Sequence, residues 1–136
     1  MKHFALNNKE TNRKDSTSIA SERAIREIYL KPFEIIVKEA RPFSLMSSYN
    51  IVNGIRASEN RELLTDILRL EWGFDGFVTT DWRTHGEHYL ECLAGSDLKM
   101  PRGYPERVKE ALDRGFISIE DIRLSARRIL SVILKL

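Results

Sequence analysis

Residues 71–82 of the chain read EWGFDGFVTTDW, and this stretch decides the fold. Its first residues end an amphipathic helical pattern that stops at Gly73, a residue type that is common just after a helix. An apolar run from Gly76 to Thr80 follows, and such a run predicts a buried strand. The strand is followed directly by Asp81 and Trp82. A helix, a tight turn and a buried strand that ends in polar residues are typical of a parallel α/β sheet.

Three further short runs resemble this strand. They cover His3–Leu6, Phe43–Tyr49 and Asp97–Met100. Apolar residues at helical spacing predict helices over 21–37, 60–73, 86–94, 105–114 and 119–134. Ser21 and Asn60 should cap the first two of these, and Pro32 should kink or split the first. The polar stretch 7–18 reads as a loop, and Asn53-Gly54 marks a turn.

Strands that alternate with helices predict an α/β fold built from parallel βαβ units. One interpretation is an open, doubly wound four-stranded sheet. The other is four βα units of a (β/α)8 TIM-type barrel, that is, a half barrel with parallel strands and outer helices, since a whole barrel needs about 250 residues. The glycines form neither the GxGxxG nor the GxxxxGK motif of nucleotide-binding open sheets. The pattern therefore favours the half barrel, with residues 1–136 as one partial domain.

Composition excludes several classes of function. The 22 Lys and Arg against 20 Asp and Glu give a net charge of +2, too balanced to attract nucleic acid or a membrane surface. Cys92 is the only cysteine, so neither an intrachain disulfide nor a thiolate zinc cluster can form. The histidines lack the spacing of a metal motif. No apolar h-region opens the chain and no run of 18 apolar residues occurs, so we expect a cytoplasmic chain without a membrane span.

Polar and aromatic side chains lie at the ends of the expected strands. They are Lys2 and His3, then Tyr49, then Asp81 with Trp82. In barrels, residues at the carboxyl ends of strands meet on one face and carry function. Directional donors, an aromatic face and a carboxylate together suit an uncharged, polyhydroxylated ligand such as a sugar.

Six segments carry a closer resemblance. They contain Lys2-His3-Phe4 and Asn8–Arg13; Ser21–Arg23 with Arg26–Leu30 and Pro32–Glu34; Met46–Asn50 with Asn53-Gly54; Glu71–Gly76; Thr80-Asp81-Trp82; and Ala94–Pro101. In these residues and their order the chain resembles the family 3 glycoside hydrolases of β-glucosidase type, and within them the second half of the N-terminal barrel domain. The resemblance covers essentially the whole chain.

The resemblance implies hydrolysis of terminal non-reducing β-D-glucosyl residues, or related β-glycosyl residues, by a retaining mechanism without cofactor or metal. Asp81 matches the nucleophile. Lys2 and His3 match the pair that hydrogen-bonds the sugar hydroxyls, and Tyr49 matches the phenol that orients the nucleophile. Met46 matches a wall of the sugar subsite and Trp82 its apolar floor. The implied partner is a β-glucoside or oligosaccharide.

Several features depart from the family pattern. Thr80 stands where Ser is common. The first barrel half, with an Asp and an Arg that grip the sugar, and the sandwich domain that supplies the acid/base Glu have no counterpart here. The loop Ala5–Glu10 lacks the Gly-rich, His-bearing sequence of the acetylglucosaminidase branch. The chain therefore reads as part of a longer enzyme, and we expect it to be inactive or nearly so when isolated.

Two other functions remain compatible with these residues. One is a non-catalytic carbohydrate-binding remnant, and the other is an interaction fragment that completes a partner barrel. Exposed strand edges of a half barrel would also favour self-association.

Some charged residues and one aromatic residue have simpler interpretations. We expect Asp97 to be structural, Trp72 to lie in the core, and Glu10 and Arg13 to form an ion pair at the rim. The arginines of the last helix read as a solvated basic face, comprising Arg123, Arg127 and Arg128.

Overall fold

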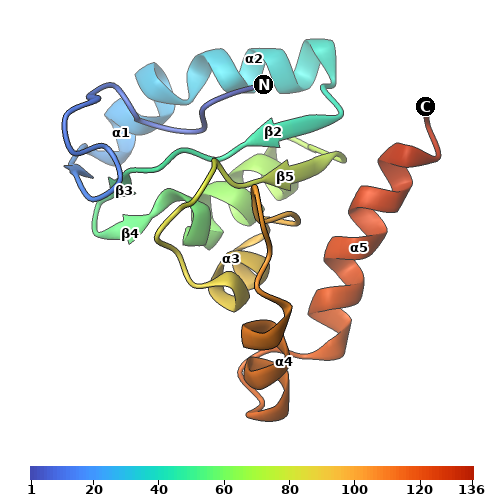
Figure 1. Ribbon diagram of the computed structural model, residues 1–136. Coiled ribbons are helices and arrows are strands. Elements are labelled where there is room, and N and C mark those ends of the chain that lie inside the picture. The colour runs from blue at the N-terminus through green and yellow to red at the C-terminus, as the bar shows by residue number, and fades with distance from the viewer.

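The computed structural model describes residues 1–136 as an α/β fold in which helices lie outside short, mostly parallel strands (Figure 1). The strands are β1 (Thr17–Ser18), β2 (Ser44–Met46), β3 (Ile51–Val52), β4 (Ile55–Arg56) and β5 (Phe77–Thr79). The helices are α1 (Glu22–Ala24), η1 (Ile25–Tyr29), α2 (Lys31–Ala40), η2 (Ala57–Glu59), η3 (Glu62–Glu71), α3 (His88–Ala94), α4 (Pro105–Asp113) and α5 (Ile119–Ile133).

The centre of the fold is the parallel pair β2–β5, in which Leu45 lies opposite Val78. Single parallel bridges extend it on both sides, from Phe4 to Ser47 and from Thr79 to Leu98. The order across the centre is therefore the N-terminal segment, β2, β5 and the segment around Leu98. All four expected strands lie side by side, but the outer two are reduced to one bridging residue each.

Apolar side chains fill the space between these strands and the helices. Leu45 and Val78 are fully buried, as is Phe4. The ring of Phe4 packs edge-on against Phe33 at 5.1 Å and against Trp72 at 6.0 Å between ring centroids. Edge-to-face packing adds to the burial of the rings. These contacts anchor the N-terminal segment beside β2 and confirm the interpretation of Trp72 as a residue packed on the core.

Local sequence signals position the first helices. The Ser21 side chain accepts from the Ala24 N–H, and the Asn60 side chain accepts from the Leu63 N–H. Both are N-caps of the expected kind. The helical stretch before Pro32 breaks at Leu30, between η1 and α2, as the proline predicts.

The segment 51–56 is a hairpin that the helix and strand pattern did not predict beyond its turn. β3 and β4 pair antiparallel, and β1 pairs parallel with β3 on the other side. The turn residues Asn53 and Gly54 have φ angles of 47° and 92°, which Asn and Gly tolerate best. The expected loop 7–18 thus ends in a short strand.

The Asp97 side chain is fully buried and links β5 to two arginines. Its carboxylate pairs with Arg69 at 2.6 Å and Arg128 at 3.0 Å, and it accepts from the Val78 N–H at 2.8 Å. The structural interpretation of Asp97 is confirmed. The solvated interpretation holds for Arg123 and is wrong for Arg128, whose side chain is only 19% exposed because it turns inward to this carboxylate.

None of the helices combines the length and apolar composition that crossing a bilayer requires.

Candidate functional site

Asp81 lies one residue beyond Thr80, at the carboxyl end of β5, where its backbone leaves the strand. Its side chain is only 12% exposed. Oδ1 accepts from the Trp82 N–H at 2.6 Å, while Oδ2 lies 3.5 Å from His3 Nε2. One carboxylate oxygen is therefore fixed by the backbone, and the other faces the imidazole.

Thr80 secures this end of the strand. Its buried hydroxyl donates to the Asp81 carbonyl at 2.9 Å and accepts from the Met100 N–H at 2.9 Å. The threonine thus ties the turn at Asp81 to the next segment of the parallel centre. A serine hydroxyl in its place could make the same two bonds, so this departure from the family pattern leaves the local geometry intact.

His3 reaches Asp81 because the residue after it is locked beside β2. The Phe4 N–H donates to the Met46 carbonyl at 2.9 Å, and the Ser48 N–H donates to the Phe4 carbonyl at 2.6 Å. The His3 side chain is 33% exposed, and Lys2 beside it is exposed. The structure therefore brings His3 to the carboxylate, with the Lys2 ammonium free to meet a ligand at the surface.

Tyr49 lies beneath the segment that carries Trp82. Its hydroxyl donates to the Trp82 carbonyl at 2.6 Å. Burial, together with the nearby Asp81 carboxylate, raises the pKa of the Tyr49 phenol. Arg13 and Lys14 cover the face of its ring, at 4.8 and 5.3 Å from the ring centroid. The phenol is thus close to Asp81 but fixes the backbone after it.

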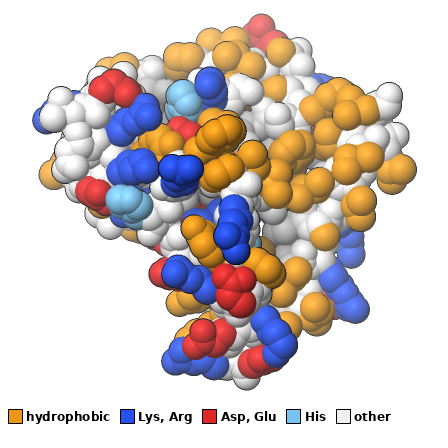
Figure 2. All heavy atoms as spheres, in the orientation of Figure 1, with side chains coloured by type: hydrophobic (Ala, Val, Ile, Leu, Met, Phe, Trp, Pro, Cys, Tyr) orange, Lys and Arg blue, Asp and Glu red, His pale blue; other side chains and the backbone are white.

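The two apolar members of the expected site differ in exposure. Trp82 is 56% exposed, whereas Met46 is half-buried at the end of β2. Figure 2 shows Lys, Arg and His side chains gathered on the side of the molecule that carries the N-terminal segment, next to apolar surface. Neither Asp81 nor His3 lines any of the five hollows whose lining residues are described here.

A second layer of the site was not foreseen from the sequence. Arg56 donates to the carbonyls of Lys14 and Tyr49 and pairs with Asp15 at 3.3 Å. Asp15 in turn lies 3.0 Å from His85 Nδ1. These bonds join the loop before β1 to the loop after Trp82. Glu10 pairs with Arg13 at 2.8 Å, as expected, at the rim of the same loop.

Nothing in strand or helix periodicity identifies Arg56, because two of its three partners, Lys14 and Asp15, lie 42 and 41 residues away in the chain. An arginine two residues after the Asn53-Gly54 turn was the available signal. No group of three or more His, Cys, Asp or Glu side chains is arranged to hold a metal ion.

Comparison with known proteins gives one consistent result. Residues 1–132 match the model of the family described as the glycosyl hydrolase family 3 N-terminal domain. The chain is 62% identical over 121 residues to beta-glucosidase A of Butyrivibrio fibrisolvens, a match that covers 89% of this chain and 15% of that protein. It is 41% identical over 136 residues to an exo-alpha-(1->6)-L-arabinopyranosidase of Bifidobacterium longum, covering 99% of this chain and 18% of that protein.

Solved structures agree with these relatives. Beta-glucosidase 3B of Thermotoga neapolitana, in complex with glucose, superposes with a TM-score of 0.95 at 45% identity. That match covers 98% of this chain and 20% of the solved chain. The chain therefore spans between 15% and 20% of the length of these relatives.

Proposed function

The chain belongs to the glycosyl hydrolase family 3 N-terminal domain family, and from this premise we propose that it carries the nucleophile half of a retaining glycosidase. In this proposal Asp81 attacks terminal non-reducing β-D-glucosyl residues as part of a longer enzyme. The observation that carries it is the low-exposure carboxylate at the end of β5 with one oxygen held by the Trp82 N–H and the other 3.5 Å from His3.

We interpret the fold as four βα units of a (β/α)8 barrel. Support comes from the parallel order of the N-terminal segment, β2, β5 and the Leu98 segment, with Asp81 following the carboxyl end of a strand. Functional side chains gather at that end in barrels of this kind. In this account residues 1–136 are one partial domain, and the acid/base carboxyl comes from outside it.

The first chemical step uses the free oxygen of the nucleophile. Asp81 Oδ2 forms a bond to the anomeric carbon while the bond from that carbon to the leaving oxygen breaks, and the leaving oxygen keeps the electron pair. Oδ1 stays on the Trp82 N–H, which orients the carboxylate. A carboxylic acid of another domain protonates the leaving oxygen. In the second step water attacks the anomeric carbon, releases Asp81 and gives its proton to that same carboxylate.

The remaining site residues bind the sugar. Lys2 donates from its ammonium and His3 from a ring N–H to sugar hydroxyls, while Trp82 offers its exposed indole face to the apolar face of the ring. Met46 forms a wall of the same subsite, and Tyr49 holds the Trp82 carbonyl so that the segment keeps its course. Each of these roles is assigned by family resemblance and supported by position.

The isolated chain should turn over slowly. Without a general acid, leaving groups that need protonation lose about 10²- to 10⁴-fold in rate. The edges of the parallel centre, at Phe4 and Leu98, each carry only one bridging residue, so they are open to pairing with another chain.

A second sugar remains a candidate because one relative, 41% identical, is an arabinopyranosidase. The L-arabinopyranosyl ring lacks the exocyclic carbon of the glucosyl ring and has the opposite configuration at C4, so parallel assays with both aryl glycosides distinguish the two. Glucosyl preference is the expected result.

The test is pre-steady-state release of dinitrophenolate from a dinitrophenyl β-glucoside, whose leaving group needs no protonation. We expect a burst of about one equivalent per chain followed by slow turnover, the kinetic sign of a covalent intermediate. Asp81→Asn should abolish the burst, and the control Asp113→Asn, an exposed residue of α4, should keep it. A burst that survives in Asp81→Asn would exclude this carboxylate as the nucleophile.

The parent chain and the Asp81→Asn variant also distinguish the two alternative functions, a carbohydrate-binding remnant and an interaction fragment. A carbohydrate-binding remnant would bind glucose equally well with Asp or Asn at position 81 and give no burst. An interaction fragment would bind sugar only after the missing part of a family 3 barrel is added.

A further inference from the structure

A charged pair is buried behind the candidate site, outside the residues that the proposed chemistry uses. Lys99 Nζ lies 2.6 Å from Glu91 Oε2, and the two side chains are only 3% and 1% exposed. Glu91 belongs to α3, and Lys99 follows the Leu98 bridge. Charged residues are almost never this buried unless they are paired and hydrogen-bonded.

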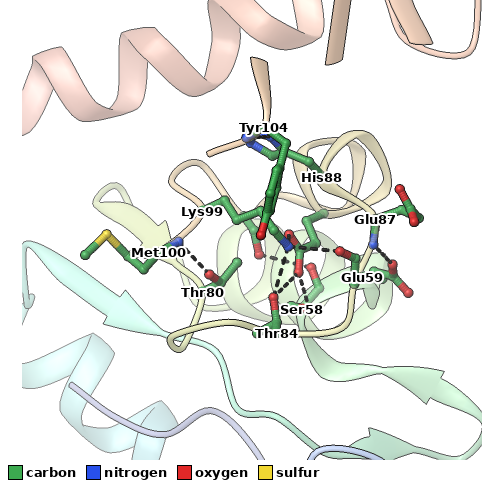
Figure 3. A network of polar contacts seen from close by, with 12 residues as sticks. Ser58, Glu59, Thr80, Thr84, Glu87, His88, Lys99, Met100 and Tyr104 are labelled. Carbon is green, nitrogen blue, oxygen red and sulfur yellow. Dashed lines mark hydrogen bonds and ion pairs between the residues drawn. The ribbon is translucent and has the colours of Figure 1, made fainter. Parts of the chain in front are cut away.

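Every polar group of the pair has a partner. The Lys99 ammonium donates to Glu91, to the Gly86 carbonyl at 2.9 Å and to Thr84 Oγ1 at 3.1 Å, which uses its three N–H groups. Glu91 Oε1 accepts from Ser58 Oγ at 2.8 Å and from Thr84 Oγ1 at 2.7 Å. Figure 3 shows these side chains converging from separate parts of the fold, with the Tyr104 ring beside the ammonium.

Two of these partners, Thr84 and Gly86, belong to the segment 81–86 that carries Asp81 and Trp82. This segment contains no helix or strand, and the Arg83 N–H donates to the Met100 carbonyl at 3.0 Å, so side-chain bonds make up most of what holds its course. A Cβ at Gly86 would collide with the Glu91 carboxylate, so the backbone passes directly against the pair. The segment is therefore held behind by Glu91 and Lys99, and in front by the bond from Tyr49 to the Trp82 carbonyl.

We propose that the Glu91–Lys99 pair is a positioning device that fixes segment 81–86 and thereby orients Asp81 and Trp82 in the site. The catalytic meaning of this role rests on the proposed function. The claim that the pair fixes segment 81–86 does not rest on the proposed function, because it follows from the contacts alone. Glu91 and Lys99 touch neither substrate nor reacting atoms and act through Thr84 and Gly86.

A role in positioning differs from a role in stability in one measurable way. Removing one member of a buried pair leaves an uncompensated charge, whereas replacing both by neutral groups of similar size is often neutral for stability. The double variant Glu91→Gln/Lys99→Met removes both charges. It also removes the donor to the Gly86 carbonyl, while it keeps an acceptor for Ser58 and Thr84. The double variant should therefore recover the stability that the single variants lose, but segment 81–86 should remain more mobile than in the parent.

The experiment measures amide hydrogen exchange and thermal melting of the 136-residue chain, its two single variants and the double variant. The matched control is Arg26→Gln, which breaks an exposed pair with Glu71. The indole N–H signals of Trp82 and Trp72 are recorded in parallel, with Trp72 as the internal reference. Exchange reports the local opening of a segment separately from global unfolding.

We expect both single variants to melt lower than the parent and the double variant to melt near it. In the double variant, amides of residues 82–87 should exchange about tenfold faster or more, the Trp82 signal should shift or broaden, and Trp72 should stay unchanged. If the single variant Lys99→Met fails to fold, the double variant still tests the proposal. The proposal is overturned if exchange of 82–87 and the Trp82 signal return to the parent values together with the melting temperature.

This readout needs no turnover, so it separates the two proposals. No dinitrophenolate burst from the parent chain, together with faster exchange of 82–87 in the double variant, would remove the proposed chemistry and leave the positioning device. A burst from the parent chain, together with exchange of 82–87 in the double variant at the parent values, would remove the device and leave the chemistry.

Discussion

Asp97→Asn should cost a large share of the chain's stability. The Asp97 side chain is fully buried and the Arg69 guanidinium is only 7% exposed, so neutralising the acid leaves a cation in the interior without a counter-charge. Breaking a buried pair in this way costs about 3–5 kcal/mol. A domain of this size has about 5–15 kcal/mol of stability in total. The expected fall in melting temperature is therefore about 10 °C or more.

Thermal melting near neutral pH, followed by circular dichroism, measures this effect. Asp113→Asn is the matched control because it breaks the exposed pair with Lys109, and it should change stability by less than about 0.5 kcal/mol. The variant Arg69→Met/Asp97→Leu, which removes both charges, should recover part of the loss. A melting temperature of Asp97→Asn within about 2 °C of the parent, or an equal fall in Asp113→Asn, would refute the reasoning.

Three further predictions concern the site and single ionisable groups. Tyr49→Phe removes the hydroxyl that bonds the Trp82 carbonyl and lies near Asp81, so the burst rate with the dinitrophenyl glucoside should fall about tenfold while the melting temperature changes by a few degrees. An unchanged rate would contradict the role of the hydroxyl. Burial raises the pKa of the Cys92 thiol, so its alkylation by iodoacetamide at about pH 8 should be slower than that of a cysteine peptide and should match it only after denaturation. Hydrogen bonding to His85 lowers the pKa of the Asp15 carboxyl. The stabilising contribution of the ionised carboxyl is therefore present above the ordinary carboxyl pKa and is lost as the pH falls through the lowered pKa. The melting temperatures of Asp15→Asn and the parent should converge at acid pH, and a difference that stays constant with pH would show that the ionised form is not involved.

Local signals in the sequence predict the elements that depend on neighbours in the chain. Caps at Ser21 and Asn60, the break before Pro32 and the left-handed glycines after η3 and α3 are fixed by backbone groups within a few residues. The position of Asp81 directly after a buried strand follows from the same kind of pattern. These features could be expected because the physics that determines them is short-ranged.

Features that depend on tertiary contacts could not be predicted from local signals in the sequence. The outer strands shrink to single bridges at Phe4 and Leu98 because each has a neighbour on one side only. Arg128 lies on a helix face that reads as solvated, yet it turns toward Asp97, which is 31 residues earlier in the chain. The partners of Glu91 converge from separate loops, and no periodicity in one helix indicates that.

Family resemblance supplied the roles within the site, and the structure refines one of them. Tyr49 matches a phenol that orients the nucleophile, but its hydroxyl is bonded to the Trp82 backbone. The orienting donor on Asp81 itself is the Trp82 N–H.

The most direct test of the central claim is intact mass after incubation with a dinitrophenyl 2-deoxy-2-fluoro-β-glucoside, followed by peptide mapping. The fluorine slows release of the sugar, so an intermediate on the nucleophile accumulates. The account predicts one added fluoroglucosyl group per chain, on the peptide that contains Asp81, and none in Asp81→Asn. A label on another residue would contradict the assignment of Asp81 as the nucleophile. No label on a chain that melts cooperatively would contradict the claim that residues 1–136 assemble a nucleophilic sugar site by themselves.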